Sequence, residues 1–376
     1  MSTVSFSVRA ALCWALLLLA GCVDPYMPDA ITVPTNYLVV DGFINCNGVS
    51  EIKLSRTYNI SASTPPPRVS LATVYVEEES GPRYLLRESP VGTYTSSALV
   101  LNRAKRYRLR ITTNGGSDYA SEFVPAKFTP RIDSISWKAE DTGVGIRVNS
   151  HDASGTTQYY KWDYEETWEF APLVNPILEY ANGQIIPIRT RYPQRCWRNA
   201  SSTAITQAKT TNLSQDVVSN FLLLTLPPNA ERLRYKYSIL VRQYAQTREE
   251  YAYWDLLKKN TENIGTLFDP LPSQLTGNIR CLSNPEEPVL GFIGAHSVEE
   301  KRIFIDRLRL PFPWRMLSGY EDCYPPDTVK APQSVYNVLE AGLIPVFLSS
   351  AGYVVSTVDC VDCRRRGTAT RPAFWQ

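Results

Sequence analysis

The sequence predicts a mainly β protein: an N-terminal β-sandwich of the immunoglobulin or fibronectin type, followed by a second sandwich-like domain that carries one amphipathic helix. Short runs rich in Val, Ile, Leu, Thr and Tyr recur from residue 36 onward. Clusters of Gly, Pro and Asn separate these runs, as turns separate the strands of a sandwich. Residues 247–262 instead combine helix-capping residues with aromatic and apolar side chains at helical spacing.

The first two dozen residues predict a bacterial lipoprotein signal. Arg9 precedes an apolar run over residues 10–19, and Leu-Ala-Gly-Cys ends at Cys22. Small residues before a cysteine suit a signal peptidase, and the Cys22 thiol is the expected site of lipidation. An uncleaved anchor is the weaker alternative, because a membrane-spanning helix needs about 20 apolar residues. We expect residues 1–21 to be removed and Cys22 to anchor the chain to the membrane.

The mature N-terminus is expected to form a tether and then a sandwich domain. Residues 22–35 contain turn formers and acids without a periodic apolar pattern, which is typical of an extended linker. Residues 36–130 are the predicted first domain. In residues 107–111 apolar and basic side chains alternate, which places one face on a core and the other in water. Strands are expected at residues 37–44, 51–58, 71–76, 84–87, 107–112 and 119–124.

Residues 131–310 are the predicted second β-rich domain. Its helix is expected at residues 247–262, because Thr247 and Glu250 have capping-box spacing. Residues 311–376 are rich in Pro, Gly and Cys and are expected to form an extension that depends on disulfides more than on a core. Strands of the second domain are expected near residues 132–137, 144–148, 159–170, 235–244, 277–282, 289–294 and 302–305.

The aromatic segment 159–170 divides into two faces at the spacing of a strand. Lys161, Asp163, Glu165 and Glu169 form a face that resembles a solvated surface. The other face is aromatic but includes Glu166, for which we favour a structural partner such as Arg242 over a catalytic role. The aromatic side chains that we expect to contact a ligand are Trp162, Tyr164 and Trp168 of this segment, with Tyr253 of the helix.

Six cysteines remain after signal removal and lipidation, and an exported chain is expected to use them in disulfides. The spacing leaves the connectivity open. Our first hypothesis pairs Cys196 with Cys281, and a second bridge joins Cys323 to Cys360 or Cys363. A redox or zinc role for the latter two is less favoured, because no second CxxC motif or nearby His completes a site. The state of Cys46 stays open.

The composition and the absence of known motifs argue against several classes of function. Lys and Arg number 39 against 37 Asp and Glu, so we expect no nucleic-acid partner. The two histidines, His151 and His296, are far apart in sequence, which argues against histidine triads and multi-histidine metal sites. No phosphate loop, nucleophile elbow or calcium loop occurs, so we expect no cofactor and no metal. A hydrolase that uses two carboxylates on separate strands leaves no local motif and stays an alternative.

Six segments carry a resemblance to a known family: YLVVDG (37–42), YYKWDYEETWEF (159–170), YSILVRQY (237–244), YWDLLKKNTE (253–262), GNIRC (277–281) and CVDCR (360–364). With these segments the chain resembles the family known as domain of unknown function 4249 (DUF4249), lipoproteins of Bacteroidota. The resemblance implies a lipoprotein of the outer membrane that acts beside a TonB-dependent receptor. It implies no catalytic residue, because the family has none assigned.

Together these observations predict a non-enzymatic binding or accessory lipoprotein for nutrient uptake. Its expected partners are the membrane, through the lipid on Cys22, a TonB-dependent receptor, and a glycan or peptide ligand. Its expected location is the outer membrane, at the periplasmic face or, as we favour from Asp24 and Asp29, at the cell surface. The alternatives are a glycan-active hydrolase that uses Glu166, and an adhesin or structural surface protein.

Overall fold

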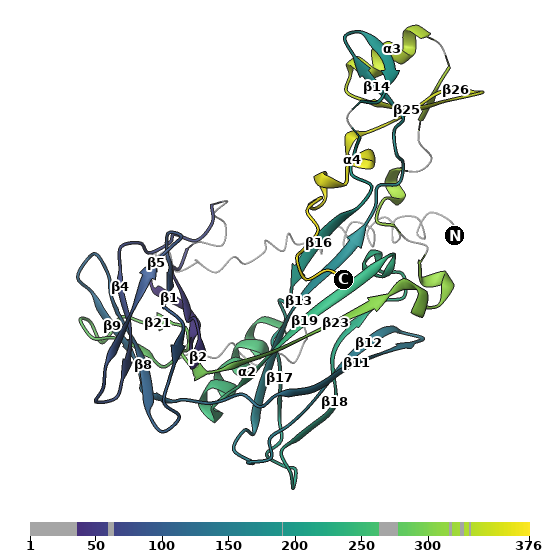
Figure 1. The fold of residues 1–376 in the computed structure, drawn as a ribbon. Helices are drawn as coiled ribbons and strands as arrows, with labels where there is room; N and C mark the ends of the chain where they lie inside the picture. The colour runs from purple at the N-terminus through teal and green to yellow at the C-terminus, as the bar shows by residue number, and fades with distance from the viewer. Residues whose placement is uncertain are drawn as a thin grey trace, which may run out of the picture.

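The computed structural model describes residues 36–58, 64–189, 191–262, 277–315, 318–323, 327–330 and 332–376. The predicted signal peptide, the lipidation site Cys22 and the tether lie outside the described residues. Two β domains and a smaller C-terminal lobe follow one another in space, with the lobe projecting from the far end of the second domain (Figure 1). Within the described residues, no helix is both long and apolar enough to span a membrane.

The first domain is built on a mostly antiparallel sheet, which has 11 strands among the described residues and encloses the domain's core. Its strand order is β20-β9-β8-β4-β5-β6-β3-β1-β21, with β10 and β22 beside β8 and β1. Tyr94, Tyr107 and Tyr119 are fully buried among aliphatic side chains in this core. Its strands are β1 (Leu38–Asn45), β2 (Asn47–Gly48), β3 (Glu51–Arg56), β4 (Thr73–Glu78), β5 (Arg83–Glu88), β6 (Thr93–Thr95), β7 (Leu99–Val100), β8 (Arg106–Thr112), β9 (Asp118–Ser121) and β10 (Val124–Pro125), joined by β20 (Ile279–Cys281), β21 (Val289–Leu290) and β22 (Ala295–His296).

The last three strands correct the predicted domain boundary. Residues 277–296 were assigned to the second domain, but β20 pairs with β9, and β21 and β22 pair in parallel with β1. Ile279, Val289 and Ile293 are buried in the first core. The chain therefore forms most of the second domain before it returns to complete the first. The prediction failed because pairing between strands distant in sequence cannot be seen in the local periodicity of either strand.

The second domain is the expected second sandwich. One sheet has the order β11-β12-β18, and the other has the order β16-β13-β19-β23 with β17 beside β13. Their facing sides enclose a core that includes Ile146, Val148, Trp162 and Val241. The strands are β11 (Ile132–Glu140), β12 (Gly143–His151), β13 (Tyr159–Phe170), β16 (Cys196–Ser201), β17 (Thr206–Lys209), β18 (Val217–Leu226), β19 (Lys236–Ala245) and β23 (Val298–Asp306), and the short helix η1 (Glu231–Leu233) precedes β19.

The predicted helix is confirmed as α2 (Arg248–Glu262). The Glu250 amide donates a hydrogen bond to Thr247 Oγ1 at 3.1 Å, which satisfies one free amide of the first turn. The Glu250 carboxylate, which a capping box would turn back to the backbone, instead lies 3.3 Å from Nε2 of His296. The start of α2 is thereby fixed against the strands that return to the first domain.

The C-terminal lobe has more structure than the predicted extension. Val335, Leu339 and Val355 are buried in a small core of its own, and Tyr180 from the hairpin β14–β15 packs there. That hairpin, which we did not predict, is inserted between β13 and β16. The elements are β14 (Leu178–Ala181), β15 (Gln184–Pro187), β24 (Asp327–Val329), β25 (Ile344–Ser349), β26 (Gly352–Ser356), α3 (Pro332–Glu340), α4 (Val358–Val361), η4 (Glu321–Cys323) and η5 (Cys363–Arg365). The short helices η2 (Arg307–Arg309) and η3 (Phe312–Arg315) follow β23 and lie against the second domain, where Leu310 and Trp314 pack on its core.

Two disulfides join the lobe to the second domain and close it on itself. Cys323 bonds to Cys360, one of the two predicted alternatives. The predicted Cys196–Cys281 pair is wrong, because Cys196 bonds to Cys363. Cys281 and Cys46 are buried thiols in the first domain. The prediction failed because Cys281 lies on a strand of the first core, whereas Cys196 belongs to the second.

Candidate functional site: the cleft between the two domains

The aromatic face of β13 does not form a binding surface. Trp162 and Trp168 are 1% and 3% exposed and belong to the sandwich core, so their predicted role as ligand contacts is wrong. Tyr164 is half-buried beside them. Tyr253 is also half-buried, since its ring packs 5.3 Å from that of Phe292. Burial together with the Asp41 charge raises the pKa of Tyr253 to about 12.

Glu166 has a structural partner, but not the predicted one. Arg232 Nη1 donates to both Glu166 carboxylate oxygens at 2.7 and 2.6 Å, and the Tyr237 hydroxyl donates to Oε1 at 2.7 Å. Arg242 was the wrong candidate because it lies opposite Asp163 in the β13–β19 register, and alternate residues of a strand face opposite sides. Glu166 is 3% exposed and fully engaged, which is the environment of a structural carboxylate.

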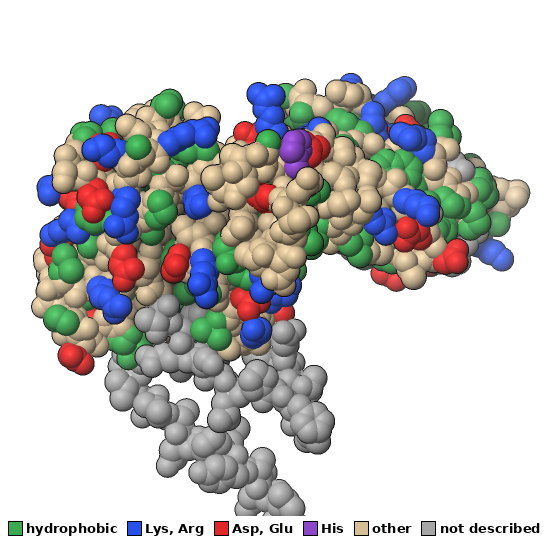
Figure 2. All heavy atoms as spheres, turned by 90° about the horizontal axis from the view of Figure 1, so that it is seen from below, with side chains coloured by type: hydrophobic (Ala, Val, Ile, Leu, Met, Phe, Trp, Pro, Cys, Tyr) green, Lys and Arg blue, Asp and Glu red, His purple; other side chains and the backbone are tan. Residues whose placement is uncertain are grey.

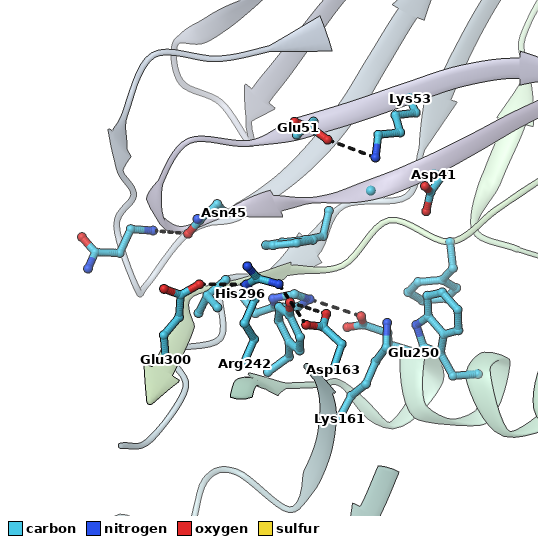
Figure 3. A pocket seen from close by; sticks show the side chains of 17 residues that line it. Asp41, Asn45, Glu51, Lys53, Lys161, Asp163, Arg242, Glu250, His296 and Glu300 are labelled. Carbon is cyan, nitrogen blue, oxygen red and sulfur yellow. Dashed lines mark hydrogen bonds and ion pairs between the residues drawn. The ribbon is translucent and has the colours of Figure 1, made fainter. Parts of the chain in front are cut away.

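The opposite face of β13, predicted to be a solvated surface, lines a cavity of about 760 Å³ between the two domains. Figure 3 shows its walls: β1 and β3 of the first domain lie above, and β13, β19, β23, α2 and residues 277–296, here called the return segment, lie below. An adjoining cavity of about 440 Å³ extends toward residues 201–205. Six residues line both cavities and make them one cleft: Asp41, Lys53, Lys161, Asp163, Arg242 and Trp254.

An ion network holds the floor of the cleft. Arg242 lies 2.8 Å from Glu300, 3.3 Å from Glu165 and 3.6 Å from Asp163. The Tyr244 hydroxyl donates to Asp163 at 2.5 Å, and burial followed by the Asp163 charge raises the pKa of Tyr244. Because each group fixes the next, the side chains from β13, β19 and β23 form a pre-organised polar surface.

His296 lies at the back of the cleft and was missed in the sequence, where its neighbours resembled a turn. Its imidazole is buried, stacks on Phe43 at 4.5 Å between ring centroids, and contacts Tyr244 edge-on at 5.3 Å. Nε2 faces Glu250, while Nδ1 has no hydrogen-bond partner among the described residues. No local motif marks this histidine, because its neighbours come from both domains.

Lys161 stands on the same floor without an ion pair. Its ammonium lies 3.7 Å from the centre of the Trp254 ring, a cation–π contact, and within 4 Å it meets no carboxylate of the described residues. Burial lowers the pKa of Lys161, and the charges of Glu250, Asp163 and Asp41 oppose that effect. A desolvated lysine that lines a cavity is more typical of a functional site than of a structural one.

A separate cavity of about 730 Å³, lined by Trp137, Arg302 and Phe304 among others, contains basic and aromatic side chains but no acidic side chain of the described residues. No group of three or more His, Cys, Asp or Glu side chains within the described ranges is arranged to hold a metal ion. The face shown in Figure 2 carries acidic and basic side chains intermixed over both domains. His151 is exposed and bonded to Asp133 at 2.8 Å, and that carboxylate raises the pKa of His151.

Comparison with known proteins agrees with the resemblance seen in the sequence. A family model described as "Domain of unknown function (DUF4249)" matches residues 23–302. The match covers the first domain, the second domain as far as the middle of β23, and every residue that lines the cleft. No curated protein matches the chain. The protein therefore belongs to the DUF4249 family.

Proposed function

We propose that the protein is a lipid-anchored, non-enzymatic binding component of a nutrient-uptake system, which holds a small polar ligand in the cleft between its two domains. The observation that carries this proposal is the cleft itself, lined by charged and aromatic side chains from both domains. Ligand sites occur preferentially at domain interfaces, in cavities of roughly 300–1,000 Å³ with a few convergent polar groups.

Support for the lipid anchor and for the receptor partner comes from the sequence. The lipoprotein signal that ends at Cys22 supports attachment to the outer membrane, with the domains at the cell surface or in the periplasm. The family resemblance supports action beside a TonB-dependent receptor. A tethered protein reaches such a receptor at high effective concentration, so weak contacts suffice for the pair to form.

The surroundings of Glu166 favour binding over the hydrolase alternative. Both oxygens of Glu166 accept hydrogen bonds from Arg232, and the carboxylate is buried beside the sandwich core and does not line the cleft. A general acid needs access to the substrate. A carboxylate that is 3% exposed has little access of this kind.

Recovery of the tagged, lipidated protein from native outer membranes in mild detergent tests the proposal. We expect mass spectrometry to find a TonB-dependent receptor in stoichiometric amount. Cys22→Ala serves as the matched control and should leave the protein out of the membrane fraction. Recovery of the lipidated protein without a receptor would contradict the receptor-associated function and favour an independent binder or adhesin.

A further inference from the structure

We propose that the cleft selects zwitterions, that is, compounds that carry both an ammonium group and a carboxylate, the chemistry of free amino acids and short peptides. This inference rests on the proposed function, because it names the class of ligand that the cleft holds. It follows from which charges in the cleft are paired and which are not.

Most charged groups of the cleft already have a partner. Arg242 is shared by Asp163, Glu165 and Glu300, as described above. Lys53 pairs with Glu51 at 3.1 Å, although its cross-strand neighbour in the β1–β3 register is Asp41. Glu250 faces His296. These contacts hold the walls in place, although three carboxylates around one guanidinium leave an excess of negative charge on the floor.

Two opposite charges remain. Lys161 comes from the floor, on β13, and Asp41 comes from the facing wall, on β1, and both side chains are labelled in Figure 3. Asp41 is exposed and makes no hydrogen bond or ion pair with any described residue that would neutralise it. A ligand carboxylate would pair with Lys161 of the second domain, and a ligand ammonium would pair with Asp41 of the first. With both ion pairs formed, the Lys161 ammonium would no longer be a desolvated charge without an ionic partner.

The aromatic side chains argue against a neutral sugar. Sugar rings are held by stacking on open aromatic faces, but the Lys161 ammonium occupies one face of Trp254. Phe43 stacks on His296, and Tyr253 packs against Phe292. The aromatic groups of the cleft therefore position cations and one another. The Trp254 ring fixes the Lys161 ammonium in the orientation that a carboxylate would meet.

Calorimetric titration of the protein with four probes tests this inference: alanine, trialanine, N-acetyl-trialanine and trialanine amide. We expect at least one of the two zwitterions to bind, and each blocked tripeptide to bind at least tenfold more weakly than trialanine. Comparing alanine with trialanine tells whether the free amino acid or the peptide is the better ligand. Maltotriose, a neutral glycan of similar length, is included as a competitor.

Charge variants assign each end of the ligand. Lys161→Met should bind trialanine and its amide equally, and Asp41→Asn should bind trialanine and its N-acetyl form equally. Lys161→Arg keeps the cation and should retain the preference for the free carboxylate. The control variant Lys138→Met removes a lysine of the strand β11 that is 75% exposed and does not line the cleft, and it should behave as the parent protein.

The outcomes separate this inference from the proposed function. Equal affinity for trialanine and both blocked forms would overturn zwitterion selection, as would the absence of binding by any amino acid or peptide probe. Binding of maltotriose in place of the peptides would overturn it too, but would keep the cleft as a ligand site. Loss of receptor association, measured separately in membranes, would contradict the proposed function and not the ligand chemistry.

Discussion

Lys161 and Glu166 lie on the same strand and face opposite sides of the sheet. The difference between them shows that burial and pairing determine whether a charged side chain is structural or is available to a ligand. Glu166 points into the sandwich and is bonded to Arg232 and Tyr237. Lys161 points into the cleft and has only an aromatic ring beside its ammonium. The sequence showed the alternation of the two faces, but it favoured the aromatic face as the binding surface. Period-two spacing identifies two faces without telling which one borders a cavity.

Glu166→Gln should lower the free energy of unfolding by about 1–3 kcal/mol, because the buried Arg232 interaction loses its charge. Glu169→Gln on the outward face is the matched control. Its partner Arg195 is 47% exposed, so a loss of at most about 1 kcal/mol is expected there. Urea unfolding followed by circular dichroism measures both. Equal stability of Glu166→Gln and the parent protein would contradict the structural role.

Lys161→Met should raise the melting temperature at neutral pH while it weakens ligand binding. Burial holds the pKa of Lys161 below the ordinary value of 10.5, so the folded state binds this proton less tightly than the unfolded state. The charged form therefore costs stability below the pKa of the folded state, and this cost disappears as the pH rises toward 10.5. The gain in melting temperature should shrink between pH 7 and pH 10. A melting temperature at pH 7 below that of the parent would contradict this account.

At the scale of elements, strong local patterns in the sequence were sufficient to predict many strands and the helix α2. The alternation in residues 107–112 corresponds to β8, and Thr247 caps the helix as its spacing indicated. The strand β18 was missed because its pairing with β12 shifts register twice and Asn220 adopts a φ of 48°. The β14–β15 hairpin carried a sign that we overlooked. Asn182-Gly183 at its turn has the positive φ values, 53° and 76°, that this dipeptide favours.

The disulfide connectivity also concerns the arrangement of elements. Each bridge joins two segments whose proximity cannot be predicted from the spacing of the cysteines in the sequence. Peptide mapping under non-reducing conditions should recover Cys196 linked to Cys363 and Cys323 linked to Cys360. Cys46 and Cys281 should react with iodoacetamide only after unfolding, since both thiols are buried and burial raises the pKa of Cys46 to about 12. A peptide that links Cys196 to Cys281 would contradict the assignment.

At the scale of the whole molecule, the path of the chain creates the cleft. Residues 126–130 lead from the first domain into the second, and residues 295–298 do so again after the chain has returned to the first domain. The two segments are hydrogen-bonded side by side, from Lys127 N to the Ala295 carbonyl at 2.8 Å and from Ser297 N to the Lys127 carbonyl at 2.9 Å. Gln243 of β19 donates to the Pro130 carbonyl at 2.8 Å. This double connection holds both walls of the cleft near a fixed geometry, so we expect a site that is largely pre-formed.

The site itself could not be predicted from the sequence for the same reason. Its side chains come from β1, β3, β13, β19, β23, α2 and the return segment, and none of these elements carries a local motif that marks the site. Only the return of residues 277–296 to the first domain brings His296 and Phe292 beside Lys161 and Trp254. A lipoprotein anchor is a prediction that sequence can make, because its signal is a contiguous motif, whereas the cleft depends on tertiary pairing.

Native mass spectrometry of the protein, purified in mild detergent, tests the central claim, that this cleft holds a ligand. The parent protein, incubated with the low-molecular-weight fraction of the growth medium, should carry a small molecule that dissociates on collisional activation. Lys161→Met should carry much less of it, and the control Lys138→Met should carry as much as the parent. The same adduct on all three proteins, or none on the parent, would contradict the assignment of the cleft as the binding site.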